Sequence, residues 1–100
     1  ASAAMGTDAG KKRVIELSHA STIIAISGVT GQDYAGQIVM IKNTSASGTA
    51  AHKVTLDAGS FNGTNKIATL NAPGETLMVW FDSAGDGIIM ENVGSVALSG

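Results

Sequence analysis

Residues 80–92, WFDSAGDGIIMEN, bring two aspartates and two glycines together between apolar runs, an arrangement that could bind calcium. An EF-hand loop needs oxygen ligands at its positions 1, 3 and 5, glycine at position 6 and a bidentate glutamate at position 12. Counted from Asp82, positions 5 and 6 fit, but Ala84 and Val93 stand at positions 3 and 12. Two required ligands are missing, so the pattern does not predict a calcium site.

The same aspartates, Asp82 and Asp86, could also act as a pair of catalytic carboxylates. Such a pair works in a cleft that shifts the pKa of one carboxyl group, whereas a tip rich in glycine and aspartate is normally solvated. We therefore predict a β-hairpin, in which the aspartates form the turn between a strand that ends at Phe81 and one that starts near Ile88.

The two histidines, His19 and His52, lie on different predicted segments and have no histidine or glutamate at metal-ligand spacing, which favours structural roles. The sequence contains no G-x-S-x-G elbow, P-loop or G-x-G-x-x-G motif. The triplets that begin at Asn43 and Asn62 match N-glycosylation acceptors but are interpreted as turns. We predict no enzyme, cofactor or metal; a histidine within hydrogen-bond reach of an acidic residue in a pocket would revive a hydrolytic function.

The elements that position these residues are short apolar runs rich in β-branched side chains, which are typical of strands. The runs cover residues 13–17, 21–26, 36–43, 52–56, 66–70, 75–81, 87–92 and 95–99. They predict an all-β fold, a small antiparallel β-sandwich or barrel of about eight short strands.

Turn residues separate the runs. Asn62 and Gly63 are suited to a type I′ hairpin turn, in which both residues take positive φ. Pro73 and Gly74 suit the central positions of a type II turn. Three glycines punctuate residues 27–36, for which we predict a longer loop.

Two of the runs are apolar on both faces. Residues 38–41 are all apolar, so both faces of that strand should be covered, by the chain itself or by another subunit. In residues 75–81 alternation predicts this inward set: Leu77, Val79 and Phe81. Met78 and Trp80 then face outward, where they form either a second packing layer or an interface anchor. We predict an interface formed by Met40, Met78 and Trp80.

The composition limits the classes of protein. A chain of 100 residues with 44% apolar and 14% charged residues is a globular chain with a small core, and its lack of cysteine excludes disulfides. The formal net charge is −2, and the basic residues 11–13 are expected to solvate the first strand. We therefore predict binding neither to nucleic acid nor to a membrane.

The beginning of the chain differs from the rest. Residues 1–10 are small and polar without an apolar period, so we expect an N-terminal arm over 1–11 that is flexible or ordered by a partner, followed by a single β domain over 12–100. No signal-peptide pattern or apolar run long enough for a membrane helix occurs, and the Ala1 start suits removal of an initiator Met. These features favour synthesis in a cytoplasm as a complete product.

Residues 50–100 resemble small virion proteins of tailed bacteriophages, namely capsid decoration (cement) proteins and related fibre or spike modules. The shared pattern is an HKVTL-type strand, a GSFNGT-type turn, an APGETL-type edge and a characteristic ending. That ending comprises Asp82, Ser83, Gly85, Gly87, Ile88, Ile89, Asn92, Gly94, Val96, Leu98 and Ser99. Gly87 stands where an aromatic residue is common, so we expect Trp80 to supply the aromatic packing instead.

The resemblance implies a non-enzymatic all-β subunit, often a homotrimer, that binds the major capsid protein on the capsid surface of a virion and stabilises the particle by bridging capsid subunits. A tail fibre or spike module that binds a host-surface carbohydrate is the alternative. The Ser/Thr/Asn-rich residues 43–50 and 60–65 motivate that alternative, although the chain has few aromatic residues for sugar stacking.

Overall fold

The computed structural model describes residues 14–100. The expected arm over residues 1–11 and the basic residues 11–13 lie outside this part of the chain. The elements are β1 (Val14–Leu17), β2 (Ala25–Thr30), the 3₁₀ helix η2 (Gly31–Tyr34), β3 (Ile38–Asn43), β4 (His52–Ala58), β5 (Ile67–Leu70), β6 (Thr76–Phe81), β7 (Gly87–Val93) and β8 (Ala97–Ser99). The predicted all-β class and the eight short strands are confirmed.

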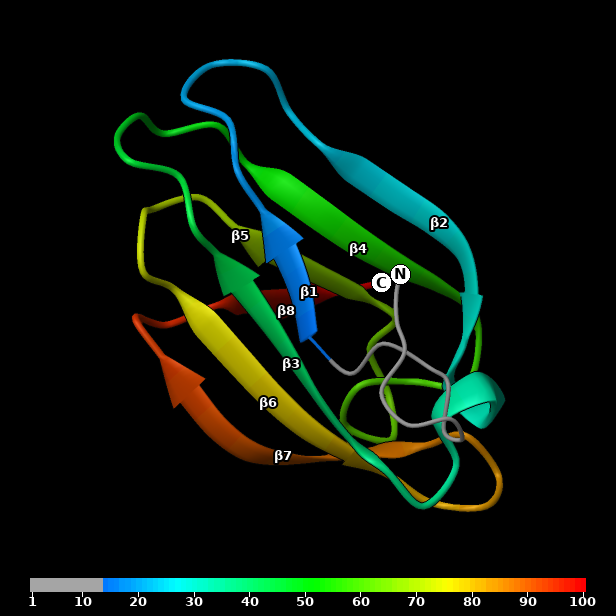
Figure 1. Ribbon diagram of the computed structural model, residues 1–100. Coiled ribbons are helices and arrows are strands. Elements are labelled where there is room, and N and C mark those ends of the chain that lie inside the picture. The colour runs from blue at the N-terminus through cyan, green and yellow to red at the C-terminus, as the bar shows by residue number, and fades with distance from the viewer. Residues whose placement is uncertain (1–13) are drawn as a thin grey trace.

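The strands form a sandwich of two four-stranded sheets (Figure 1). The first sheet has the order β1-β3-β6-β7 and the second has the order β2-β4-β5-β8. The first four strands alternate between the sheets, so β3 runs parallel to β1 and β4 runs parallel to β2. All other pairs are antiparallel. Both sheets are therefore mixed, whereas the sequence predicted an antiparallel sandwich or barrel.

The core lies between the sheets and is filled by alternate residues of the central strands. The predicted inward residues of β6, Leu77, Val79 and Phe81, are 0%, 0% and 1% exposed. The facing layer comes from the second sheet, and its buried apolar members are Val54, Leu56, Ala68 and Leu70. Period-2 alternation thus predicted the inner faces of these strands correctly.

The second strand differs from its prediction, because the apolar run at 21–26 enters regular pairing only at Ala25. The strand then continues to Thr30 through residues that were expected to form a loop. Gly28 does not end the strand; it takes a φ of +78° where the register with β4 shifts. A glycine at positive φ allows the bulge, so the strand bends and resumes.

The turns follow their predictions in part. Gly74 has a φ of +88° and the Glu75 N–H donates to the Ala72 carbonyl oxygen, in agreement with the predicted type II turn. The type I′ prediction is wrong because Asn62 is not at positive φ. Its side-chain Oδ1 instead accepts hydrogen bonds from the Thr64 and Asn65 N–H groups, which shapes a longer connection between β4 and β5.

Aromatic packing inside the sandwich does not involve Trp80, contrary to expectation. Phe81 packs between Tyr34 and Phe61, with ring centroids 6.1 and 6.3 Å away. Gly87 has no room for a side chain, because an added Cβ would collide with the Phe61 carbonyl oxygen. Trp80 instead lies on the outer side of its sheet, opposite Ile88 in the register of β6 and β7.

Candidate interaction surface

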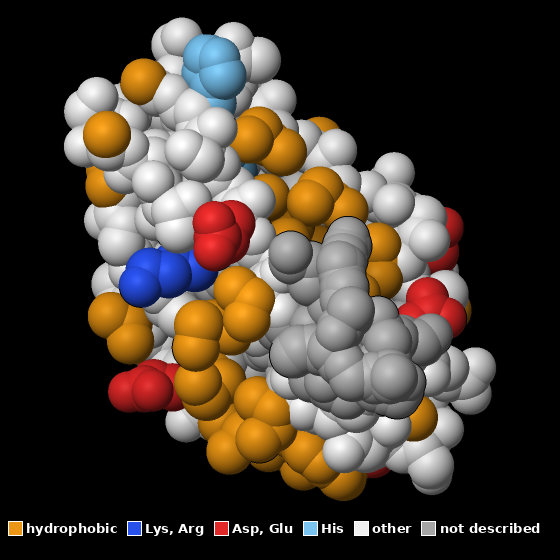
Figure 2. All heavy atoms as spheres, viewed as in Figure 1, with side chains coloured by type: hydrophobic (Ala, Val, Ile, Leu, Met, Phe, Trp, Pro, Cys, Tyr) orange, Lys and Arg blue, Asp and Glu red, His pale blue; other side chains and the backbone are white. Residues whose placement is uncertain are grey.

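The outer side of the first sheet carries a continuous group of apolar side chains, here called the apolar face. Its members are Val14 of β1, Ile38 and Met40 of β3, Met78 and Trp80 of β6, and Ile88, Met90 and Val93 of β7. Space-filling Figure 2 shows these apolar side chains gathered over β3, β6 and β7. Within residues 14–100, no further strand covers this outer side of the first sheet.

Strand register explains why these residues are neighbours. Val14 pairs with Met40, which pairs with Met78, so three strands place apolar side chains in one row. In the next row Trp80 lies between Ile38 and Ile88. The predicted interface residues Met40, Met78 and Trp80 are thus brought together on one face; their role as an interface stays a prediction.

A bulge in β7 extends the face. The register between β6 and β7 shifts after Met78, so that Met78 pairs with Glu91 and Val79 pairs with Ile89. Met90 is the extra residue, and it is 53% exposed. A bulge keeps the strand paired while turning an extra side chain outward. Sequence alternation missed Met90 and Val93 because the bulge breaks the period of two.

The apolar face remains exposed within the described part of the chain. Ile38 is 42% exposed, Ile88 is 59% exposed and Val93 is 46% exposed, whereas Met40, Met78 and Trp80 are half-buried. Two charged positions border these side chains: Glu16 pairs with Lys42 at the far end of β1 and β3, and Glu91 of β7 pairs with Met78. Coverage of both faces of β3, expected from its apolar run, is therefore not provided by residues 14–100.

The second sheet supplies an internal comparison, because its outer face has a different chemistry. One row contains Ala25, Lys53, Thr69 and Ala97, and the next contains Thr55, Ile67 and Ser99. Small and polar side chains dominate both rows, as expected for a strand face in water. The same fold thus presents one ordinary solvent face and one apolar face, and isolated monomers rarely expose a large continuous apolar patch.

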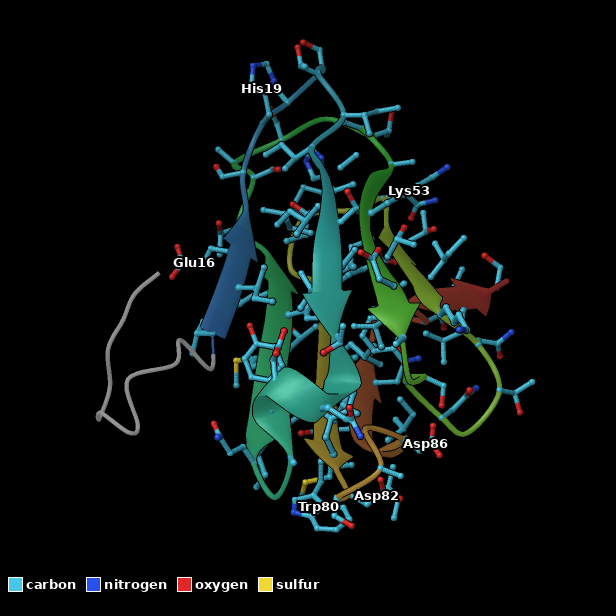
Figure 3. All side chains as sticks on the ribbon, turned by 90° about the vertical axis from the view of Figure 1, so that its right-hand side faces the viewer. Glu16, His19, Lys53, Trp80, Asp82 and Asp86 are labelled. Atoms are coloured by element: carbon cyan, nitrogen blue, oxygen red, sulfur yellow. The ribbon has the colours of Figure 1, made fainter. Side chains whose placement is uncertain are left out.

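The tip at residues 82–86 is a hairpin turn, as predicted. The Asp82 Oδ1 accepts hydrogen bonds from the Ala84 and Asp86 N–H groups, both at 2.9 Å. The Asp86 carboxylate accepts a 3.3 Å hydrogen bond from the Ser60 hydroxyl, which ties the tip to the connection between β4 and β5. Figure 3 shows both aspartates beside this connection, at the same end as Trp80. The Asp82 carboxylate therefore holds the backbone of the turn, and the Asp86 carboxylate connects the turn to a neighbouring loop.

The histidines organise the opposite end of the sandwich. His52 is fully buried, and its Nδ1 accepts a hydrogen bond from the Ile24 N–H at 3.0 Å. Its Nε2 lies 3.0 Å from the His19 carbonyl oxygen and 3.2 Å from the Ser45 Oγ. Since Nδ1 accepts, Nε2 carries the proton and donates. No acidic side chain appears among the hydrogen-bond partners found for either histidine in residues 14–100.

Other candidate residues also have structural surroundings. Asn43, the first glycosylation candidate, is 2% exposed and its amide donates to the Leu70 carbonyl oxygen. Phe61, which a sugar-stacking site in residues 60–65 would need at the surface, is 1% exposed. The structure contains no group of three metal-ligating side chains and no membrane-spanning helix in the residues it describes.

The single tyrosine lies near the aromatic core. Burial and the neighbouring Asp33 carboxylate raise the pKa of the Tyr34 phenol above its ordinary value. Both effects disfavour the phenolate.

In comparisons with known proteins, no protein-family model, curated protein or solved structure matches the chain.

Proposed function

We propose that this chain is a non-enzymatic structural protein of a tailed-phage virion, which decorates the capsid surface and stabilises it by bridging capsid subunits. The observation that carries the proposal is the difference between the two outer sheet faces. An apolar face centred on Met40, Met78 and Trp80 suits a subunit that becomes buried against a neighbour.

The chemistry of the remaining polar groups supports a structural role. Asp82 and Asp86 hold a turn, and His52 and Ser45 hold loops. The resemblance of residues 50–100 to phage decoration proteins specifies the kind of assembly. The burial of Phe61 counts against the alternative, a carbohydrate-binding fibre module, whereas Trp80 is only half-buried.

The test is the copy number of the chain in virions purified from the phage that encodes it. Quantitative mass spectrometry should find the chain in numbers comparable with the major capsid protein. Particles assembled without the chain should disrupt at a lower temperature than complete particles. Absence from virions would refute the proposal, and a few copies per particle would support a fibre or spike instead.

A further inference from the structure

Methionine is distributed unevenly in the described part of the chain. The buried core of residues 14–100 contains none, although methionine often fills gaps in cores. The three methionines of this part are Met40 of β3, Met78 of β6 and Met90 of β7, here called the methionine row. Met5 lies outside the described residues. All thioethers of residues 14–100 are therefore gathered on the apolar face.

Strand register makes the three side chains neighbours. Met40 pairs directly with Met78, and the Cβ atoms of directly opposite residues lie about 5 Å apart. The bulge in β7 places Met90 and Glu91 together opposite Met78. The row therefore crosses three adjacent strands and ends beside the Glu91 carboxylate.

The row is most exposed at the end next to Glu91. Met90 is 53% exposed, whereas Met40 and Met78 are half-buried. Met90 is also the extra residue of the bulge, and its strand β7 has only one neighbour, β6, in the first sheet. A reagent in solution therefore reaches Met90 more easily than the other two methionines.

A thioether at a surface is open to one covalent change in particular, oxidation to the sulfoxide. The sulfur attacks one oxygen of hydrogen peroxide, so that an S–O bond forms and the O–O bond breaks. The sulfur loses two electrons and the peroxide gains them, and the proton of the transferred oxygen joins the departing hydroxide to give water. The product is a polar side chain with a hydrogen-bond acceptor where an apolar one stood.

We propose that Met90 is a redox modification site: a peroxide oxidises it first and then Met78 and Met40, and the sulfoxides make the apolar face polar and weaken its contacts. This deepens the proposed function by naming a regulation of the apolar face, and it rests on that function only in treating the face as a subunit contact. Oxidation acts on the free chain, because a face buried against a neighbour is closed to peroxide. Two types of methionine sulfoxide reductase, one for each sulfoxide epimer, restore the thioether.

The fold should survive this change. A sulfoxide formed in a core is a buried polar group without a partner, whereas water solvates a sulfoxide at an exposed position such as Met90. Glu91 already places a charged group at this end of the row. Oxidation therefore alters the polarity of one surface and leaves the packing between the sheets intact.

Peptide mapping by mass spectrometry tests the order of oxidation in the full chain treated with hydrogen peroxide. In the folded protein Met90 should be oxidised at least about threefold faster than Met40 or Met78, because susceptibility follows exposure. In guanidinium the three rates should become equal. Circular dichroism should show that the chain with Met90 oxidised stays folded. Faster oxidation of Met40 or Met78, or unfolding on oxidation of Met90, would overturn the proposal.

Two variants separate an effect on the apolar face from oxidation in general. Met90→Leu keeps an apolar side chain of similar volume and removes the thioether. The double variant Met90→Leu with Ala25→Met moves the exposed thioether to the outer face of the second sheet. After peroxide treatment that oxidises Met90 alone, the unchanged protein should elute earlier from a hydrophobic-interaction column, and Met90→Leu should keep its retention. No shift in the unchanged protein would overturn the proposal.

Co-sedimentation with capsids that lack the chain measures the contact itself. Oxidation of Met90 should weaken binding of the unchanged protein at least about tenfold, because a buried contact leaves the sulfoxide without a hydrogen-bond partner. Treatment with both reductases should restore binding, and the double variant should bind equally before and after peroxide. Equal binding by the oxidised and unoxidised protein, or an equal loss in the double variant, would overturn the proposal.

The outcome for the proposed function is separate. If the unoxidised chain does not bind capsids, the virion function is refuted, while the peptide map and the chromatographic shift still decide this proposal. Tight capsid binding that oxidation leaves unchanged would support the function and refute the proposal.

Discussion

His52 shows how a buried polar side chain can fix loop shape in a chain without disulfides. Both of its ring nitrogens are used, one by the Ile24 N–H and the other by the His19 carbonyl oxygen and the Ser45 hydroxyl. Burial of a polar group is favourable only when its hydrogen bonds are made. The sequence indicated a structural histidine but not its partners. Ile24 lies 28 residues before His52 in the chain, and Ser45 lies 7 residues before it.

The substitution His52→Ala should lower the free energy of unfolding by about 3 kcal/mol, because it opens a cavity and leaves the Ile24 N–H unpaired. The matched control, His19→Ala, should cost less than about 1 kcal/mol, since water can replace an exposed ring. Urea unfolding followed by circular dichroism measures both values. Equal costs for the two substitutions would contradict the assigned role of His52.

Tyr34 offers a direct spectroscopic test, because it is the single tyrosine of the chain. The raised pKa of its phenol predicts that phenolate absorbance in the folded protein appears above the ordinary midpoint of about 10. The folded state then holds its proton longer than the unfolded state, so stability falls as the pH rises through this range. The chain unfolded in guanidinium should titrate at the ordinary midpoint; a folded midpoint at or below it would contradict the placement of Tyr34.

At the scale of elements, the hairpin of β6 and β7 depends on Asp82 as a hydrogen-bond acceptor. Asp82→Ala should cost about 1 kcal/mol of unfolding free energy because two N–H groups lose their partner. Asp82→Asn keeps the Oδ1 acceptor and should remain close to the unchanged protein. Thermal unfolding with and without calcium should show no shift. Stabilisation by calcium that both substitutions abolish would establish a metal site instead.

The sequence predicts which side chains of a strand face inward only where apolar residues alternate regularly along that strand. The inward residues of β6 were predicted because Leu77, Val79 and Phe81 alternate without interruption. The bulges at Gly28 and Met90 were not, since an extra residue changes the facing of everything after it. The turn at Asn62 was mispredicted. Its side chain accepts a hydrogen bond from the Thr64 N–H group, and Asn62 does not take the positive φ that a type I′ turn needs.

At the scale of the whole molecule, the mixed pairing of both sheets could not be read from local patterns. It arises because β1 to β4 alternate between layers, a property of chain path and not of any single strand. The apolar face was predicted in part: Met40, Met78 and Trp80 were identified by outward alternation. Their neighbours Val14, Ile38 and Ile88 emerge only when register places four strands side by side.

The central claim is that the apolar face becomes buried in the virion, and its most direct test is capsid binding by two matched variants. Ile88→Glu places a charge on the apolar face, whereas Ala25→Glu places the same charge on the outer face of the second sheet, opposite Lys53. Both side chains are exposed, so both variants should fold. Co-sedimentation with capsids that lack the chain measures the affinity of each.

We expect Ala25→Glu to bind as the unchanged protein does, and Ile88→Glu to bind at least about tenfold more weakly, because an unpaired charge in a buried contact costs more than about 1.4 kcal/mol. Equal binding by Ile88→Glu and the unchanged protein would contradict the claim.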